Sequence, residues 1–247
     1  MNISIHDYQA IAAGKVRRAK REEWRHSRIE ALRLPDYTFT EEVLNCATHA
    51  LGAVLGAVGL LMSLRVLLHA GSTLAMTSMT IFCVTMVMLY TNSALYHGWE
   101  LTPVKKMFQV LDHCTIFLLI AGTYAPYTLM VMGNAVGKMI FGGVAAACLV
   151  GIALNLMDMK KYRVISMVCY LAAGWCIIFA YRWISAALSP VQLALLIGGG
   201  VAYTMGAVLY GLGKTVRYMH TVWHLFVLAG SLMHFFSLYG FVLTYFG

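Results

Sequence analysis

The stretch VLNCATHALGAVLGAVGLLMSLRVLL, residues 43–68, decides the fold class of this chain. A helix that crosses the hydrocarbon core of a bilayer needs about 20 mainly apolar residues. This stretch is long enough and contains one charged residue, Arg65. Further runs of the same kind follow at approximately 74–97, 107–131, 136–156, 163–185, 190–211 and 220–245. The sequence therefore predicts an all-α membrane protein, a bundle of seven transmembrane helices.

The composition of the whole chain supports a membrane environment. Of the 247 residues, 60% are hydrophobic and 11% are charged, whereas soluble domains have about 45–50% and about 25%. So few charges cannot cover a surface in water, which excludes a soluble domain, a disordered chain and a typical nucleic-acid-binding domain. The six cysteines lie inside apolar runs without a CxxC pair. We interpret them as small buried hydrophobic side chains.

The charges between the apolar runs predict an orientation. The loops are short, including one expected at Gly213-Lys214, so consecutive helices should be antiparallel neighbours. If the N-terminus is cytoplasmic, fifteen of the 18 Lys and Arg residues fall on the cytoplasmic side, Lys105 and Lys106 among them. Because cytoplasmic loops are enriched in basic residues, the sequence predicts a cytoplasmic N-terminus and an exoplasmic C-terminus.

Residues 1–36 form a basic N-terminal segment, which we expect to be cytoplasmic and distinct from a transmembrane domain at 37–247. This segment accounts for much of the net charge of +8, and its basic residues should attract anionic lipid headgroups, with no need for a nucleic acid. It could lie on the membrane as an amphipathic helix or extend as a solvated tail. After it, Thr38 and Glu41 fit a helix-capping box.

Two features inside the apolar runs carry structural expectations. Pro126 should bend the third span, because proline removes an intrahelical hydrogen bond. The triple glycine at 198–200 is most simply explained by close helix packing, although an unwound segment of the kind found in transporters is an alternative.

Ionisable residues inside membrane spans are costly and are functional candidates by default. Ser93 and His97 should lie on the last turns of the second span, Asp112 near the start of the third, and His220 and His224 at the start of the seventh. Each i, i+4 pair lies on one helix face. Three histidines beside a carboxylate match a zinc site with an open fourth position. An ordinary pair of hydrogen-bonded histidines is the alternative for His220 and His224, and spacing alone does not show that the three helices meet.

These residues stand in a recognisable order. The strings EEVLN at 41–45, Ser93-x3-His97, LDHC at 111–114 with AGTYAP at 121–126, and His220-x3-His224 followed by His234 resemble the bacterial hemolysin III family, within the progestin and adiponectin receptor superfamily. The resemblance covers residues 37–247. It implies a seven-helix bundle that binds zinc near the cytoplasmic face through His97, His220 and His224. It further implies that Ser93 and Asp112 lie beside the water in the open position.

The resemblance also suggests a function. Receptor relatives are linked to hydrolysis of lipid amides such as ceramides, and the bacterial branch to haemolysis and membrane-lipid homeostasis. The leading hypothesis is a zinc-dependent hydrolase of a lipid amide or ester in the bacterial inner membrane, with Asp112 orienting or deprotonating water and Ser93 donating a hydrogen bond. The alternative is a non-enzymatic, receptor-like sensor with a structural zinc. A pore-forming hemolysin is disfavoured, because no charged residue lies near the membrane midplane.

The remaining polar residues have separate expectations. His234 lies ten residues beyond His224, about 15 Å along a helix, which is too far to share its metal, and we expect it to hydrogen-bond another helix. His49 could support the site, and His113 is expected to pack beside it. The aromatic residues that could border a lipid pocket are Tyr96, Tyr124, Tyr127 and Trp223.

Overall fold

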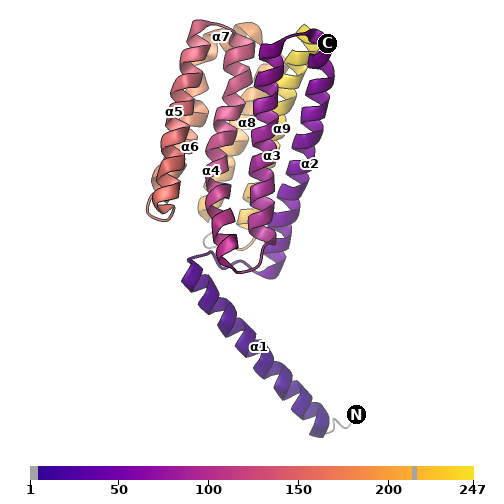
Figure 1. Cartoon of the computed structure of the whole chain (residues 1–247), viewed down its shortest axis with the longest axis vertical. Coiled ribbons are helices and arrows are strands. Elements are labelled where there is room, and N and C mark those ends of the chain that lie inside the picture. Colours follow the sequence, from indigo (N-terminus) through magenta and orange to yellow (C-terminus); the bar gives the residue numbers. More distant parts are fainter. Residues whose placement is uncertain (1–4, 213–215) are drawn as a thin grey trace.

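The computed structural model of the chain describes residues 5–212 and 216–247, so the loop expected at Gly213-Lys214 lies outside the described residues. Within them every regular element is helical, and seven spans are long and apolar enough to cross a membrane (Figure 1). This confirms the predicted seven-helix class. The spans are α2 (Phe39–Ala70), α3 (Thr73–Gly98), α4 (Pro103–Ala125) with the π-helix η1 (Pro126–Met132), α5 (Ala135–Asp158), α6 (Arg163–Trp175) with η2 (Cys176–Ala180) and α7 (Tyr181–Ala187), α8 (Pro190–Leu212) and α9 (Met219–Phe246).

The spans are arranged as a closed ring in chain order. Helices α2, α3, α4 and α5 pack in succession, α8 packs on α9, and α9 returns to lie against α2 (Figure 1). Spans α3, α4 and α9 are the most enclosed of the seven. The first and last spans are therefore neighbours, and the core lies among α3, α4 and α9.

Helix α2 begins and ends where the sequence predicts. The Thr38 hydroxyl accepts a hydrogen bond from the Glu41 backbone N–H, and the Glu41 carboxylate accepts one from Thr38 N at 2.9 Å, so the capping box is confirmed. The helix ends at Gly71, whose φ of 67° is readily available only to glycine. Inside the helix, a Cβ added at Gly52 would lie 2.7 Å from the ring of Tyr90. Glycine there allows α2 to approach α3 closely.

Irregular backbone occurs at one expected and one unexpected position. Pro126, where we expect a bend, begins the π-helix η1, a lengthened turn that accommodates the missing N–H. Helix α8 is regular through the triple glycine, and the carbonyl of Gly230 on α9 would lie 3.1 Å from a Cβ at Gly199. The packing interpretation of the glycines therefore holds. The fifth span is instead interrupted by the 3₁₀ segment Cys176–Ala180, which the sequence does not indicate.

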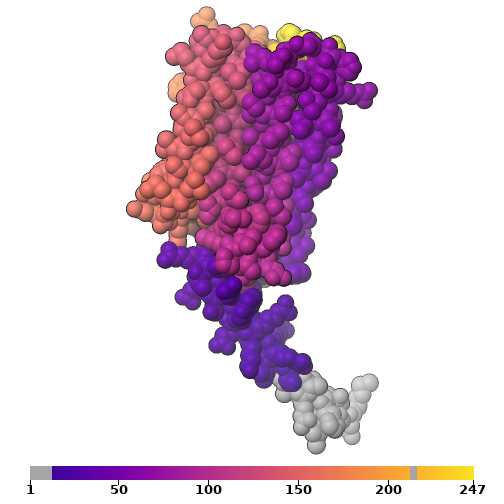
Figure 2. All heavy atoms as spheres, viewed as in Figure 1, coloured from indigo at the N-terminus to yellow at the C-terminus, as the bar shows by residue number. Residues whose placement is uncertain are grey.

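The basic N-terminal segment forms helix α1 (Ile5–Leu32), which leaves the bundle obliquely at one end (Figures 1 and 2). The connection to α2 is fixed to α1 through Arg25, whose guanidinium donates to the Asp36 carboxylate and to the Tyr37 carbonyl. Arg28 reaches the Leu101 carbonyl, in the loop between α3 and α4, at 3.4 Å. The C-terminal part of α1 is therefore attached to the same end of the bundle as the α3–α4 loop.

Candidate metal centre

Three histidines converge at the end of the bundle from which α1 departs. His97 lies in the last turn of α3, and His220 and His224 lie on the first two turns of α9. All three side chains are buried, and one ring nitrogen from each lies within 4.8 Å of the others. The structure thus brings together the three histidines that the sequence singles out, and shows that α3 and α9 meet at this depth.

Hydrogen bonds on the outer side of two rings determine which nitrogen faces the cluster. His97 Nδ1 lies 2.7 Å from a carboxylate oxygen of Glu42, and His224 Nδ1 lies 3.2 Å from the Asn45 carbonyl. Carboxylate and carbonyl oxygens only accept hydrogen bonds, so both Nδ1 atoms carry the proton. In a neutral imidazole the other nitrogen, Nε2, then presents a lone pair. Both rings therefore offer a metal-ligating lone pair on the side away from α2.

Two of the inner nitrogens have the spacing of two ligands on one metal ion. The Nε2 atoms of His97 and His220 are 3.3 Å apart, and two ligands bound at 2.0–2.1 Å in a tetrahedral zinc site are separated by about 3.3–3.4 Å. His224 Nε2 is buried without a hydrogen-bond partner. A cation at the centre would satisfy the lone pairs of all three nitrogens at once. The donor set therefore fits a metal ion with three imidazole ligands.

Glu42 contacts His97 on the side away from the cluster, and Lys105 contacts Glu42. The sequence did not predict either role. The second carboxylate oxygen of Glu42 lies 3.0 Å from Lys105 Nζ. The same amine donates to three carbonyls at the end of α3, those of Tyr96, His97 and Trp99, at 2.7–3.3 Å. Lys105, which the charge count treats as a loop residue, is 2% exposed. Carboxylate–histidine pairs of this kind orient a metal ligand and raise its basicity.

Tyr37 covers the cluster on the side of α1. Its ring stacks on that of His220, with centroids 4.9 Å apart, and lies 5.7 Å from that of His97. Burial raises the pKa of the Tyr37 phenol well above its ordinary value, so the side chain is neutral. Because the backbone carbonyl of Tyr37 is held by Arg25, the ring is tied to α1.

Ser93 and Asp112, the other two predicted site residues, are both buried near this end. Ser93 lies one turn before His97 on α3, and its Oγ has no hydrogen-bond partner among the described residues. Asp112 on α4 is 2% exposed, and its carboxylate lies 3.8 Å from His113 Nδ1. Their roles remain predictions, because among the described residues neither side chain makes a hydrogen bond to His97, His220 or His224.

From the sequence, His49 could support the site and His234 should hydrogen-bond another helix, and only the first expectation agrees with the structure. The ring of His49 stacks on that of His224 at 3.5 Å and an interplanar angle of 10°, so it supports a cluster residue by direct contact. The expected hydrogen bond from the His234 side chain to another helix is wrong. Its Nδ1 is buried without a partner among the described residues, and the ring stacks on that of Tyr203 and meets that of Tyr127 edge to face. His234 lies outside the histidine group, as predicted.

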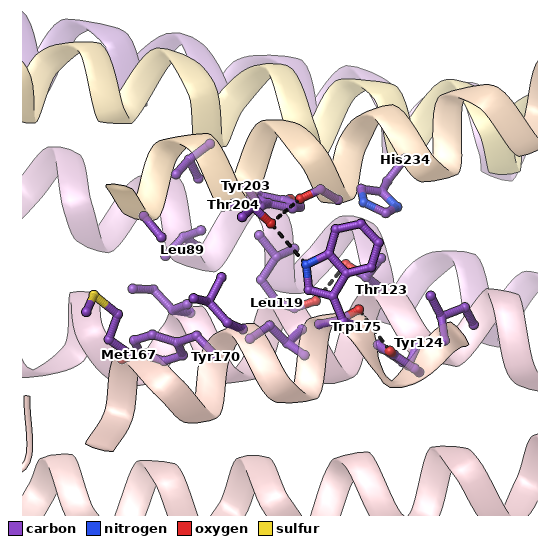
Figure 3. A pocket seen from close by; sticks show the side chains of 18 of the residues that line it. Leu89, Leu119, Thr123, Tyr124, Met167, Tyr170, Trp175, Tyr203, Thr204 and His234 are labelled. Atoms are coloured by element: carbon purple, nitrogen blue, oxygen red, sulfur yellow. Dashed lines mark hydrogen bonds between the residues drawn. The ribbon is translucent and has the colours of Figure 1, made fainter. Parts of the chain in front are cut away.

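A cavity of about 320 Å³ lies inside the bundle and is lined by His49, which stacks on His224 of the cluster. Asp112, His113 and His49 line it at the cluster end, and most of its wall is formed by apolar side chains of α4, α6 and α8 (Figure 3). Of the aromatic residues expected to border a pocket, Tyr124, Tyr127 and Trp223 do so. Tyr96 instead packs beside Lys105. The cavity gives Asp112 access to an apolar interior.

Comparisons with known proteins agree with this architecture. A family model described as haemolysin-III related matches residues 37–235. Hemolysin-3 of Bacillus cereus is 34% identical over 206 residues, covering 82% of this chain and 92% of that protein. The hemolysin-3 homolog of Bacillus subtilis is 34% identical over 200 residues, covering 81% and 93%. Human monocyte to macrophage differentiation factor is 27% identical over 212 residues, covering 82% and 84%.

Proposed function

This chain belongs to the haemolysin III family of multi-pass membrane proteins, and we propose that it is a zinc-dependent hydrolase of a lipid amide or ester with a role in membrane-lipid homeostasis. The observation that supports this proposal most directly is the convergence of three imidazole nitrogens beside a cavity that a buried carboxylate lines. Three ligands leave the fourth position of a tetrahedral site open, as catalytic zinc sites do. The substrate would be a membrane lipid whose acyl chain occupies the apolar cavity.

The proposed reaction is hydrolysis of the carbonyl–nitrogen or carbonyl–oxygen bond. When bound, zinc supplies a Lewis acid that polarises a carbonyl and makes water more acidic. Asp112 accepts a proton from the attacking water and passes it to the departing nitrogen or oxygen as the bond to the carbonyl carbon breaks. Ser93, whose hydroxyl has no competing partner, donates a hydrogen bond to the oxyanion that develops. His97, His220 and His224 would hold the metal.

The side chains around the cluster control access to it. Tyr37 covers the cluster on the α1 side, whereas on the other side the cavity lined by Asp112 and His49 lies in the interior of the bundle. A lipid would therefore approach through the bundle, with its polar head at the histidine end. Exclusion of bulk water from this region strengthens the electrostatic effect of Asp112.

We further propose the membrane placement that the charges favour. The cluster end of the bundle, where α1 emerges, would face the cytoplasm of a bacterium, and the C-terminus would face the opposite side of the inner membrane. Residues 1–36 would form a cytoplasmic segment separate from the membrane domain at 37–247. Its exposed basic side chains, including Lys15, Arg17 and Lys20, would attract anionic lipid headgroups.

The test separates metal binding from catalysis. Purified protein should contain about one zinc per chain, and replacement of His97, His220 or His224 by Ala should remove most of it. Asp112→Asn should retain the zinc and the fold but lose fatty-acid release from a panel of ceramides, acyl amides and esters, because an amide cannot take the proton. Ser93→Ala should lower the rate by about 10²–10³. Asp158→Asn is the matched control, because it makes the same change on an exposed side chain.

The outcomes distinguish the hydrolase from the alternative. Loss of zinc in Asp112→Asn would make Asp112 a fourth ligand and the site closed. No release of fatty acid from any lipid in the panel would also overturn the hydrolase. Either result would favour a receptor-like sensor in which zinc only holds α3 and α9 together.

A further inference from the structure

The cavity extends along the bundle away from the end that holds the histidine cluster, and the imidazole of His234 lies on its wall. Asp112 lines its cluster end, and Ile184 and Leu193 line it near the opposite end of the bundle. His234 lies between these ends, with Tyr127 and Tyr203 beside it. In Figure 3 its ring points from α9 toward the space that it shares with Trp175. The imidazole of His234 therefore forms part of a cavity wall that is mostly apolar.

The His234 ring lacks hydrogen-bonding partners, although it is 7% exposed. Its Nδ1 is buried without a partner among the described residues. The ring packs closely against α8, because a Cβ added at Gly199 would lie 2.6 Å from its Nε2. Tyr203 stacks on one face with centroids 5.6 Å apart. Packing against Gly199 and Tyr203 therefore holds the imidazole in place, and its Nδ1 makes no hydrogen bond.

The other polar groups along this part of the cavity all have partners. The Tyr203 hydroxyl pairs with Ser231 Oγ at 2.7 Å, and Trp175 Nε1 donates to Thr204 Oγ1 at 3.0 Å. The hydroxyls of Tyr124 and Thr123 donate to backbone carbonyls, at 3.0 and 2.7 Å. Buried polar groups in proteins are nearly always satisfied, and an unsatisfied one is destabilising. The His234 side chain has no hydrogen bond among the described residues, and because its Nδ1 is enclosed, a partner from outside the chain would reach the ring at Nε2.

We propose that His234 is the hydrogen-bonding partner of a hydroxyl group carried partway along the chain of a bound lipid. No charged side chain accompanies His234 in this part of the cavity, so a carboxylate or an ammonium group would be buried without compensation. A hydroxyl is neutral and can either donate to or accept from an imidazole. This inference rests on the proposed function only in placing the lipid head at the histidine cluster.

The geometry of α8 and α9 fixes where the hydroxyl would lie. His234 follows His224 by ten residues, about 15 Å along the helix, so the hydroxyl lies about that far from the lipid head. Gly199 on α8 is level with His234. Leu193, which also lines the cavity, precedes Gly199 by six residues, about 9 Å along α8. The cavity therefore continues past His234, which places the hydroxyl within the chain and leaves an apolar tail beyond it.

The experiment measures binding of stearic acid and of its monohydroxylated positional isomers to the purified full-length protein in detergent. Native mass spectrometry or titration calorimetry gives the dissociation constants. One narrow range of hydroxyl positions should bind about three- to tenfold more tightly than stearic acid, as expected for one added hydrogen bond. His234→Phe should abolish this preference and leave stearic acid bound. His234→Gln, which keeps a hydrogen-bonding group, should retain part of it.

Trp175→Phe is the matched control, because it alters another aromatic residue of the cavity whose N–H already has a partner, and the preference should survive it. The proposal is overturned if the wild type binds all isomers as it binds stearic acid, or if His234→Phe keeps the preference. Binding is measured without turnover, so the two proposals can fail separately. If the protein prefers one range of hydroxyl positions but hydrolyses no lipid, the proposed hydrolase is wrong and the hydroxyl subsite is retained. If it hydrolyses lipids but shows no such preference, the hydroxyl subsite is wrong and the hydrolase is retained.

Discussion

Glu42→Gln should weaken metal binding without unfolding the protein. One carboxylate oxygen of Glu42 accepts the Nδ1 proton of His97 at 2.7 Å, and the other pairs with Lys105 at 3.0 Å. Glutamine has the same size and offers one acceptor oxygen but no charge. His97 could therefore keep its orientation through the amide oxygen. It would lose the negative charge that makes its Nε2 more basic.

The expected magnitude follows from the position of Glu42 relative to the metal ligands. Changes to a residue that orients a ligand from outside the coordination shell typically reduce metal affinity by about 10–100-fold, which corresponds to about 1.4–2.7 kcal/mol. The Glu42 side chain is 19% exposed, so water can reach Lys105 when the carboxylate is removed. This exposure should limit the accompanying loss of folding stability.

The assay is competition for zinc between the purified protein and a chelator of known affinity, with thermal unfolding measured in parallel. Glu100→Gln is the control, because it removes the same charge from an exposed side chain in the loop that follows α3. The reasoning is wrong if Glu42→Gln binds zinc as tightly as the wild type. Equal weakening by Glu100→Gln would show that general charge, and not the contact with His97, controls affinity.

Three further predictions concern folding and topology. Lys105→Met should lower the free energy of unfolding by about 2–3 kcal/mol, because it leaves three helix-end carbonyls and a carboxylate without their buried amine, and chemical denaturation in detergent measures this. Gly151→Ala should lower the melting temperature, since its Cβ would lie 2.0 Å from the ring of Phe117, whereas Gly143→Ala on the same helix meets nothing within 4 Å and should be neutral or stabilising. Reporter fusions should place Met1 in the cytoplasm and Gly247 on the opposite side; finding both ends on one side would refute the proposed topology.

The sequence was sufficient for the features that depend on local pattern. The length of each apolar run predicts a span, and the i, i+4 spacing predicts that His220 and His224 share a face of α9. The capping box at Thr38 is equally local. These predictions succeed because each depends on one helix in a bilayer, where backbone hydrogen bonds must be satisfied within the span.

Features that depend on contacts between distant helices could not be predicted. Glu42 looks like a favourable charge at a helix N-terminus, and only the structure shows that it contacts His97, 55 residues later. Lys105 likewise looks like a loop charge in the sequence, because its contacts with Glu42 and with the end of α3 appear only in the folded structure. His234 was expected to find a hydrogen-bonding partner, but α8 presents Gly199 there, and the facing side chain of Tyr203 already binds Ser231.

The closed ring of helices has a consequence for the biogenesis of the protein. The groups that orient the cluster, Glu42 and Asn45, are on the first span to be synthesised, whereas His220 and His224 are on the last. Throughout translation the early half of the site is present without its counterpart, and a chain arrested before α9 contains one histidine of the three. The histidine cluster can therefore form only after α9 has been synthesised.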